Sequence, residues 1–197
     1  MYIFVVTLFG MGAWSLYRGN PIVVLAGLSV ATVLFSLAYF ITVERALLRF
    51  GSLRPQYCSI YDPYFWWHER YWKLLTPMVG MFDGTPFKGL VWRLLGVRAG
   101  RRVFDDGCSI AERTLVTIGD HCTLNAGSVI QCHSMEDGVF KSDYTVLEDG
   151  CTLGAETLVH YGVTMGQGAQ LRADSFLMKG EKVPPHARWG GNPARAM

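Results

Sequence analysis

An aliphatic residue recurs at every sixth position through most of the second half of the chain. An α-helix favours a period of about 3.6 and a simple strand a period of 2, so neither explains this spacing. A period of six is typical of a parallel β-helix, in which each coil has three short sides and each side points one aliphatic residue inward. The predicted inward residues are Ile118, Leu124, Ile130, Leu147, Leu153, Val159, Met165, Leu171, Leu177 and Val183.

A second series of positions supports this fold independently. The residue two places before each aliphatic residue should also point inward, and the narrow core requires it to be small. The small residues are Val116, Cys122, Ser128, Thr145, Cys151, Thr157, Val163, Ala169 and Ser175.

Upstream of Ile118 the period is weaker. Phe104 and Ile110 are predicted as a first pair of inward residues, followed by a slip of two positions.

The period fails once, in the segment "SVIQCHSMEDGVFKSDY" at positions 128–144. The step from Ile130 to Leu147 is 17 residues where three regular repeats need 18. The coil is therefore expected to bulge or extend here, which frees the side chains of this segment from the inward–outward pattern. We expect the break to form an active-site loop that points His133 outward, toward a neighbouring surface.

The first 43 residues contain two uncharged apolar runs, at positions 2–17 and 21–43, joined by "RGNP". The second run would reach roughly 34 Å as a helix, enough to cross a bilayer core. The pattern favours a transmembrane helical hairpin over residues 1–43. A cleaved signal peptide fits less well, because no basic segment comes first and a second run follows. A buried soluble hairpin also fits less well, because neither run has a polar face.

Arginines mark the side of the membrane on which the rest of the chain lies. Only Arg18 lies between the runs, whereas Arg45, Arg49 and Arg54 follow the second one. This bias places the C-terminal part in the cytoplasm. Residues 44–82 are a juxtamembrane segment whose tyrosines and tryptophans favour either an interfacial helix or a packing collar on the following domain. A net charge of +2 without a basic run gives no argument for nucleic acid.

The remaining residues, 83–197, form the predicted β-helix domain. The segment "GTPFKGLVWRLLG" indicates a short helix that caps the first coil, with Thr85 as N-cap, Pro86 as first helical residue and Gly96 as its end. Its predicted buried face contains Leu90, Val91, Leu94 and Leu95. The fold class is thus mainly β, a parallel β-helix preceded by a transmembrane helical hairpin and a capping helix.

Two stretches extend this prediction through resemblance. The tail "VPPHARWGGNPARAM" is similar to that of hexapeptide-repeat acyltransferases. Residues 65–120 resemble the C-terminal region of nonribosomal peptide synthetases of the ε-poly-lysine synthetase type. The resemblance implies a left-handed β-helix, a trimer or pseudo-trimer, and amide formation from a thioester donor. The donor is a carrier-linked phosphopantetheine or coenzyme A, which is a substrate and is not held tightly, and the acceptor is an amine.

His133 is the candidate general base, because a histidine near neutral pKa can take the proton of an attacking amine. It follows "LNAGSVIQC", which is similar to the segment before the catalytic histidine in several such acyltransferases. Glu136, Asp137 or Asp143 could orient its imidazole. His160 should also point outward and could bind substrate or donor. A role for either histidine as an ordinary surface side chain stays open.

Several other residues are weaker candidates. Cys132 could act as an acyl-carrying nucleophile, and Tyr144 or Tyr161 could stabilise the oxyanion. A metal site is not expected, since His121, His133 and His160 lack the paired spacing of zinc-binding β-helices. The predicted donor-binding residues, which could equally form an ordinary solvated surface, are Asn125, Lys179, Arg188, Asn192 and Arg195.

Three functions stay open from the sequence. The first is a membrane-bound transferase that joins a carrier-bound aminoacyl group to an amine through an amide bond. The second is a hexapeptide-repeat acetyltransferase that uses acetyl-CoA. The third is a β-helix that holds an assembly at the membrane without catalysis.

Overall fold

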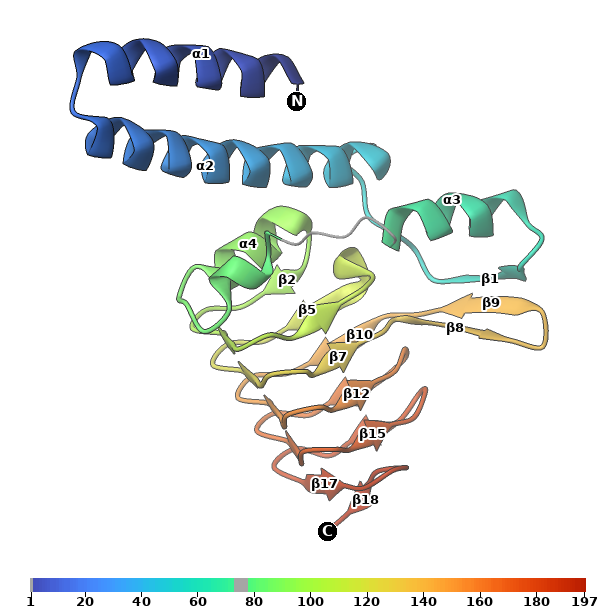
Figure 1. The fold of residues 1–197 in the computed structure, drawn as a ribbon. Coiled ribbons are helices and arrows are strands. Elements are labelled where there is room, and N and C mark those ends of the chain that lie inside the picture. Colours follow the sequence, from blue (N-terminus) through green and yellow to red (C-terminus); the bar gives the residue numbers. More distant parts are fainter. Residues whose placement is uncertain (1, 73–77) are drawn as a thin grey trace. The chain divides into compact units, whose positions relative to one another are not determined.

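The computed structural model describes residues 2–72 and 78–197, which divide into two compact units, Met1–Thr42 and Val43–Met197 (Figure 1). The first unit contains α1 (Tyr2–Arg18) and most of α2 (Pro21–Leu47). The turn between them is short, and the Ile22 amide donates to Asn20 Oδ1 at 3.0 Å at the start of α2. By length and composition, α2 is one helix that could cross a membrane. The transmembrane hairpin itself stays a prediction.

The second unit is built on a parallel β-helix, whose coils are stacked in Figure 1. Each regular coil gives one strand to each of three sheets, so strands three apart in the chain are parallel neighbours, as Leu147 is of Met165. Only the last strand pair of the second sheet, β17 with β18, is antiparallel among the described strands of these sheets. The first sheet contains β2 (Arg98–Ala99), β5 (Val116–Ile118), β10 (Thr145–Leu147), β13 (Thr164–Met165) and β16 (Lys182–Val183). The second contains β3 (Phe104–Asp105), β6 (Thr123–Leu124), β11 (Thr152–Leu153), β14 (Gln170–Leu171), β17 (Arg188–Gly190) and β18 (Arg195–Ala196). The third contains β4 (Ser109–Ile110), β7 (Val129–Ile130), β12 (Leu158–Val159) and β15 (Phe176–Leu177).

The core of the coils confirms both series of inward positions. Every aliphatic residue predicted from Ile118 to Val183 is at most 3% exposed, and every small residue from Val116 to Ser175 is at most 2% exposed. Cys122 and Cys151 lie in this core as free thiols. The small residues are needed because two inward side chains from each side must share a narrow interior.

One inward position upstream was predicted wrongly. Phe104 is 46% exposed, and its neighbour Asp105 points inward in its place, paired in register with Leu124. The Asp105 carboxylate accepts hydrogen bonds from the Trp92 indole at 2.5 Å and from the Cys108 amide at 2.8 Å. These donors allow a carboxylate to be buried in the first coil, where a hydrophobic residue was expected.

The capping helix is α4 (Lys88–Leu95), which starts later than predicted. Thr85 does not cap it, because its hydroxyl donates to the Phe82 carbonyl, in the 3-10 turn η1 (Gly80–Phe82), at 2.6 Å. The helix ends at Gly96, which has the expected left-handed conformation with φ 106°. Val91, Trp92 and Leu95 are buried, whereas Leu90 and Leu94, which were predicted to be buried, are exposed. The hydrogen bond from Trp92 to Asp105 fixes this rotation of the helix.

The break in the repeat forms a β-hairpin that extends away from the coils, with strands β8 (His133–Glu136) and β9 (Val139–Ser142) (Figure 1). β1 (Gln56–Ser59) adds to β9 as an antiparallel third strand. The helix α3 (Pro63–Trp72) packs on this sheet through Phe65, whose ring lies 5.6 Å from that of Phe140. Trp66 on the other side of α3 is exposed. The predicted extension of the coil is confirmed, and the aromatic segment covers it.

Candidate active site

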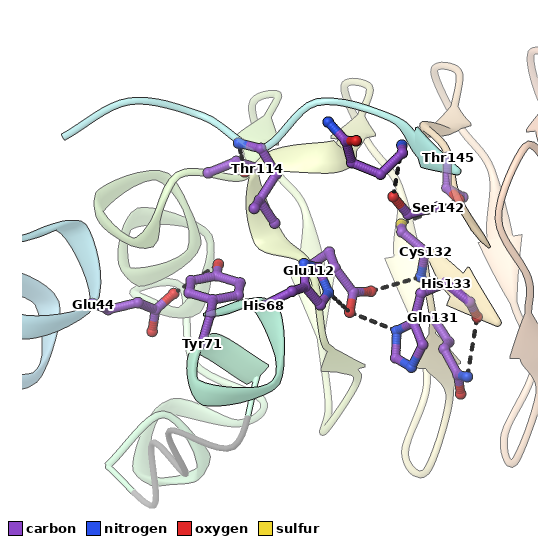
Figure 2. A network of polar contacts seen from close by, with 12 residues as sticks. Glu44, His68, Tyr71, Glu112, Thr114, Gln131, Cys132, His133, Ser142 and Thr145 are labelled. Carbon is purple, nitrogen blue, oxygen red and sulfur yellow. Dashed lines mark hydrogen bonds and ion pairs between the residues drawn. The ribbon is translucent and has the colours of Figure 1, made fainter. Parts of the chain in front are cut away.

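Glu112 is the centre of a buried polar network beside the hairpin (Figure 2). It lies between β4 and the 3-10 turn η2 (Arg113–Leu115), and its side chain is fully buried. Its Oε1 lies 2.6 Å from His133 Nδ1 and 3.3 Å from His68 Nε2. Its Oε2 accepts the Cys132 amide at 2.9 Å. One carboxylate therefore holds two histidines and the backbone at the start of the hairpin.

These contacts set the charge of Glu112 and the tautomer of His133. Burial acts to raise the pKa of Glu112, but the hydrogen bonds from His133 and His68 outweigh it and lower the pKa to about 2. Glu112 is thus ionised at neutral pH and can only accept hydrogen bonds. His133 must then donate from Nδ1, which leaves Nε2 as the basic nitrogen of the neutral ring. This is the tautomer that a general base needs.

The carboxylate beside His133 is not one of those expected from the sequence. Glu136 lies in the exposed part of the hairpin, where it pairs with Lys179 and Lys141. Asp143 Oδ1 accepts the Tyr144 amide at 2.7 Å. The prediction that Glu136 or Asp143 orients the imidazole is therefore wrong, because Glu112 is the carboxylate that contacts His133. In the sequence, Glu112 lies within the slip of two positions that follows Ile110, and this irregular step is the feature that could have indicated it.

His133 is also less exposed than predicted. Its side chain is 6% exposed, and its ring stacks on Phe140 with centroids 5.8 Å apart. The expectation that the break points His133 outward is therefore wrong for this chain by itself. The reason is α3, which places His68 against the same face of the hairpin, with its ring 4.6 Å from Phe140. In the sequence, only the many tyrosines and tryptophans around His68 indicated that this segment could pack on the domain.

The network continues to the C-terminal end of α2. Arg113, next to Glu112, donates from Nη1 to Glu44 Oε1 at 2.7 Å, and the Tyr71 hydroxyl donates to the same oxygen at 3.2 Å. Both Glu44 and Tyr71 are buried, and Figure 2 shows them on the side of His68 that faces away from His133. The residues around Glu112 are thus tied to α3 from two sides, which holds His68 and His133 in one arrangement.

His160 and Cys132 flank His133. Burial and the charge of His133 lower the pKa of His160, and its Nδ1 accepts the Tyr161 amide at 3.0 Å. His160 is half-buried rather than fully outward, and its ring lies 5.9 Å from that of Phe176. Burial raises the pKa of the Cys132 thiol, which contacts Thr145 Oγ1 at 3.3 Å. A thiol kept protonated in this way is a poor nucleophile.

The predicted donor-binding residues do not converge on His133. Asn125 Nδ2 donates to the Leu153 carbonyl at 2.6 Å, so it joins neighbouring coils. Lys179 pairs with Glu136, and Arg195 pairs with Glu181 at 2.9 Å. Arg188 and Asn192 are exposed near the C-terminal turn. Binding of the donor by these residues stays a prediction.

A groove of about 340 Å³ lies beside the hairpin, and His133 is not among the residues that line it. Both Lys141 and Ser142, neighbours on β9 whose side chains point to opposite faces of the hairpin, contribute to the lining. Tyr161 and Asp143 are also part of the lining. Of the two tyrosines considered for the oxyanion, Tyr161 lines this groove.

His68, Glu112 and His133 are residue types that bind zinc, and their ligand atoms lie within 4.8 Å of one another. The contacts of 2.6 and 3.3 Å to one oxygen are hydrogen-bond contacts. A metal-bound histidine usually donates from its other nitrogen, whereas His68 Nδ1 has no hydrogen-bond partner among the described residues. The geometry thus favours a hydrogen-bonded network of Glu112 with two histidines.

Comparison with known proteins agrees with this fold. No model of a protein family matches the chain. It is 28% identical over 178 residues to the delta-poly-L-ornithine synthetase of Acinetobacter baumannii, which covers 86% of this chain and 13% of that protein. It is 39% identical over 80 residues to a UDP-3-O-acylglucosamine N-acyltransferase of Methylobacterium sp., which covers 41% of this chain and 19% of that protein. The chain therefore spans less than a fifth of the length of either relative.

Among solved structures, a galactoside acetyltransferase in complex with coenzyme A matches 72% of this chain and 85% of its own, with a TM-score of 0.55 and 12% identity. This similarity concerns the fold alone. It identifies the β-helix as the left-handed type found in hexapeptide-repeat acetyltransferases, which confirms the predicted hand. The β-helix of the second unit is thus similar in fold to hexapeptide-repeat acetyltransferases.

Proposed function

We propose that this chain is a membrane-bound acyltransferase that forms an amide bond between a thioester-linked acyl group and an amine. The observation that carries the proposal is the contact of 2.6 Å between His133 Nδ1 and the ionised, buried Glu112. A carboxylate that fixes a histidine through Nδ1 makes Nε2 a general base and stabilises the imidazolium that forms. The two relatives, a poly-ornithine synthetase and an N-acyltransferase, support amide formation.

In the proposed reaction the amine nitrogen attacks the thioester carbonyl, so that a C–N bond forms. His133 Nε2 takes the proton that the nitrogen loses. The tetrahedral intermediate then collapses, the C–S bond breaks and the thiolate leaves. The proton on His133 returns to this sulfur, which gives a free thiol and a neutral base. Glu112 stays ionised throughout, because three hydrogen bonds stabilise its charge.

The donor is proposed to be a pantetheine thioester, linked to a carrier protein or to coenzyme A. The synthetase relative favours an aminoacyl group on a carrier, whereas the solved structure with coenzyme A favours an acetyl group. The length and apolar sequence of α2 support attachment to a membrane, with the β-helix on its cytoplasmic side. A trimer or pseudo-trimer of β-helices is proposed as the assembly, since a neighbouring β-helix could complete the donor groove.

The test uses the full chain in lipid nanodiscs with a diamino acid as acceptor. It compares acetyl-CoA with aminoacyl-pantetheine thioesters and detects the amide product by mass spectrometry. His133→Ala is expected to lower the rate about 10²- to 10⁴-fold. His121→Asn is the matched control, because His121 is an exposed turn residue with φ 59°, a conformation that asparagine tolerates. An unchanged rate in His133→Ala would contradict a general base at this position and favour the non-catalytic scaffold.

A further inference from the structure

His68 is a second buried histidine at the site, and the proposed reaction does not use it. It is fully buried in the middle of α3, 44 positions from Glu112 in the sequence. Its Nε2 approaches the same Oε1 that holds His133. Its Nδ1 has no hydrogen-bond partner among the described residues. A buried polar atom without a partner is unfavourable, so burial of the histidine has a cost at Nδ1. The hydrogen bond from Nε2 to Glu112 is the polar contact through which His68 acts on the site.

The charge of the site fixes how His68 interacts. Glu112 only accepts hydrogen bonds, so His68 donates from Nε2. If both histidines were imidazolium, one positive charge would lack a compensating partner in a buried site. The rings of Phe140, Tyr64 and Tyr71 lie 4.6, 6.1 and 6.3 Å from that of His68 between centroids, and aromatic faces offset only part of such a charge. At most one of the two histidines therefore carries the extra proton.

We propose that His68 is a positioning residue that shares the Glu112 carboxylate with His133 and thereby weakens the hold of His133 on a proton. An oxygen that already accepts one hydrogen bond offers less negative charge to a second donor, so the imidazolium of His133 is less stabilised. A weaker hold on the proton favours the unprotonated form, which a general base needs in order to accept a proton. The catalytic meaning of this effect rests on the proposed function, whereas the effect itself does not.

The other titratable groups around the pair do not replace this effect. From α3, Tyr64 faces Phe140, and burial raises its pKa to about 12. Burial keeps Cys132, on the coil side, as a neutral thiol. His160, on the next coil, has a lowered pKa through burial and the charge of His133. These three groups are neutral at pH 7. Arg113, next to Glu112 in the chain, is charged and pairs with Glu44 at 2.7 Å, whereas Glu112 contacts His133 directly.

The test measures the pKa of His133 directly in the full chain in nanodiscs, labelled with ¹⁵N-histidine and titrated by NMR. His68→Leu removes the donor and retains an apolar side chain, while His68→Gln is the matched control because its amide nitrogen can donate to Glu112. In His68→Leu the pKa of His133 is expected to rise by about 0.5 to 1 pH unit, which is the size of one hydrogen bond. In His68→Gln it is expected to stay near the wild-type value. An unchanged or lowered pKa in a folded His68→Leu protein overturns the proposal.

Two further readouts keep the result decisive. In the wild-type protein, the ¹⁵N shifts of His68 should show a proton on Nε2 and none on Nδ1; the opposite tautomer overturns the proposal even if His68→Leu does not fold. The pH profile of kcat/KM then separates this inference from the proposed function. If the NMR pKa rises in His68→Leu but the acidic limb of the profile does not move with it, His133 is not the base, and the sharing of Glu112 still stands.

Discussion

Glu112→Gln should remove a defined part of the pH dependence of folding stability. The pKa of Glu112 is about 2 in the folded chain, against 4.5 for an ordinary glutamate. A lowered pKa gives stability that is fully present above pH 4.5 and is lost as the pH falls through 2. Each pH unit is equivalent to about 1.4 kcal/mol, so the difference between the two values corresponds to about 3 kcal/mol. The glutamine variant should lack this contribution at neutral pH.

The measurement is urea unfolding of the detergent-solubilised chain, followed by near-ultraviolet circular dichroism at a series of pH values from 2.5 to 7. Wild type and Glu112→Gln should differ most near neutral pH and converge as the medium becomes acidic. Glu136→Gln is the comparison. Lys179 also lowers the pKa of Glu136, but this carboxylate is solvent-exposed, so its loss should have a much smaller effect than that of Glu112. If the two unfolding curves stay equally separated from pH 7 to pH 2.5, Glu112 does not have the strongly lowered pKa on which the site depends.

Two other predictions concern the core and the neighbouring thiol. Leu153→Ala, at a fully buried inward position, should lower the free energy of unfolding by about 2 to 5 kcal/mol, whereas Leu90→Ala on the exposed side of α4 should change it by less than about 0.5 kcal/mol; similar losses in urea unfolding would contradict the assignment of the inward face. Cys132→Ala should keep the transfer rate within about threefold of wild type, because its buried thiol is not the nucleophile. A rate lost in Cys132→Ala but retained in Cys132→Ser would point instead to a role of the Thr145 contact.

The fold could be predicted because two independent series of residues share one period. Both the aliphatic series and the small series are buried, and both follow from a coil with three sides. The cap was predicted less well, since tertiary contacts decide its details. Lys88 bonds to Asp83 and to the Val79 carbonyl at the start of α4, and Trp92 bonds to Asp105. Residue types alone do not show such contacts, so the start and buried face of α4 were assigned incorrectly.

The site could be predicted in part. The break in the period located His133, but its carboxylate was sought among residues nearby in the sequence. In a β-helix the neighbours in space lie about one coil away, and Glu112 precedes His133 by 21 residues. Glu112 falls in the other irregular step, between Ile110 and Ile118. His68 belongs to a segment without any period, so no pattern in the sequence indicated its contact with Glu112.

The two irregular steps meet because they leave the same side of successive coils. Ile110 pairs in register with Ile130, and Ile130 pairs with Val159. The residues that follow these three positions are therefore stacked, which places Glu112 next to Cys132 and His133, with His160 on the following coil. Regular coils present only a repeated surface, whereas extra residues at one corner allow side chains to leave the repeat. A β-helix can thus gather a base, its carboxylate and a further histidine by interrupting neighbouring coils at one corner, while the remaining inward positions keep the coils rigid.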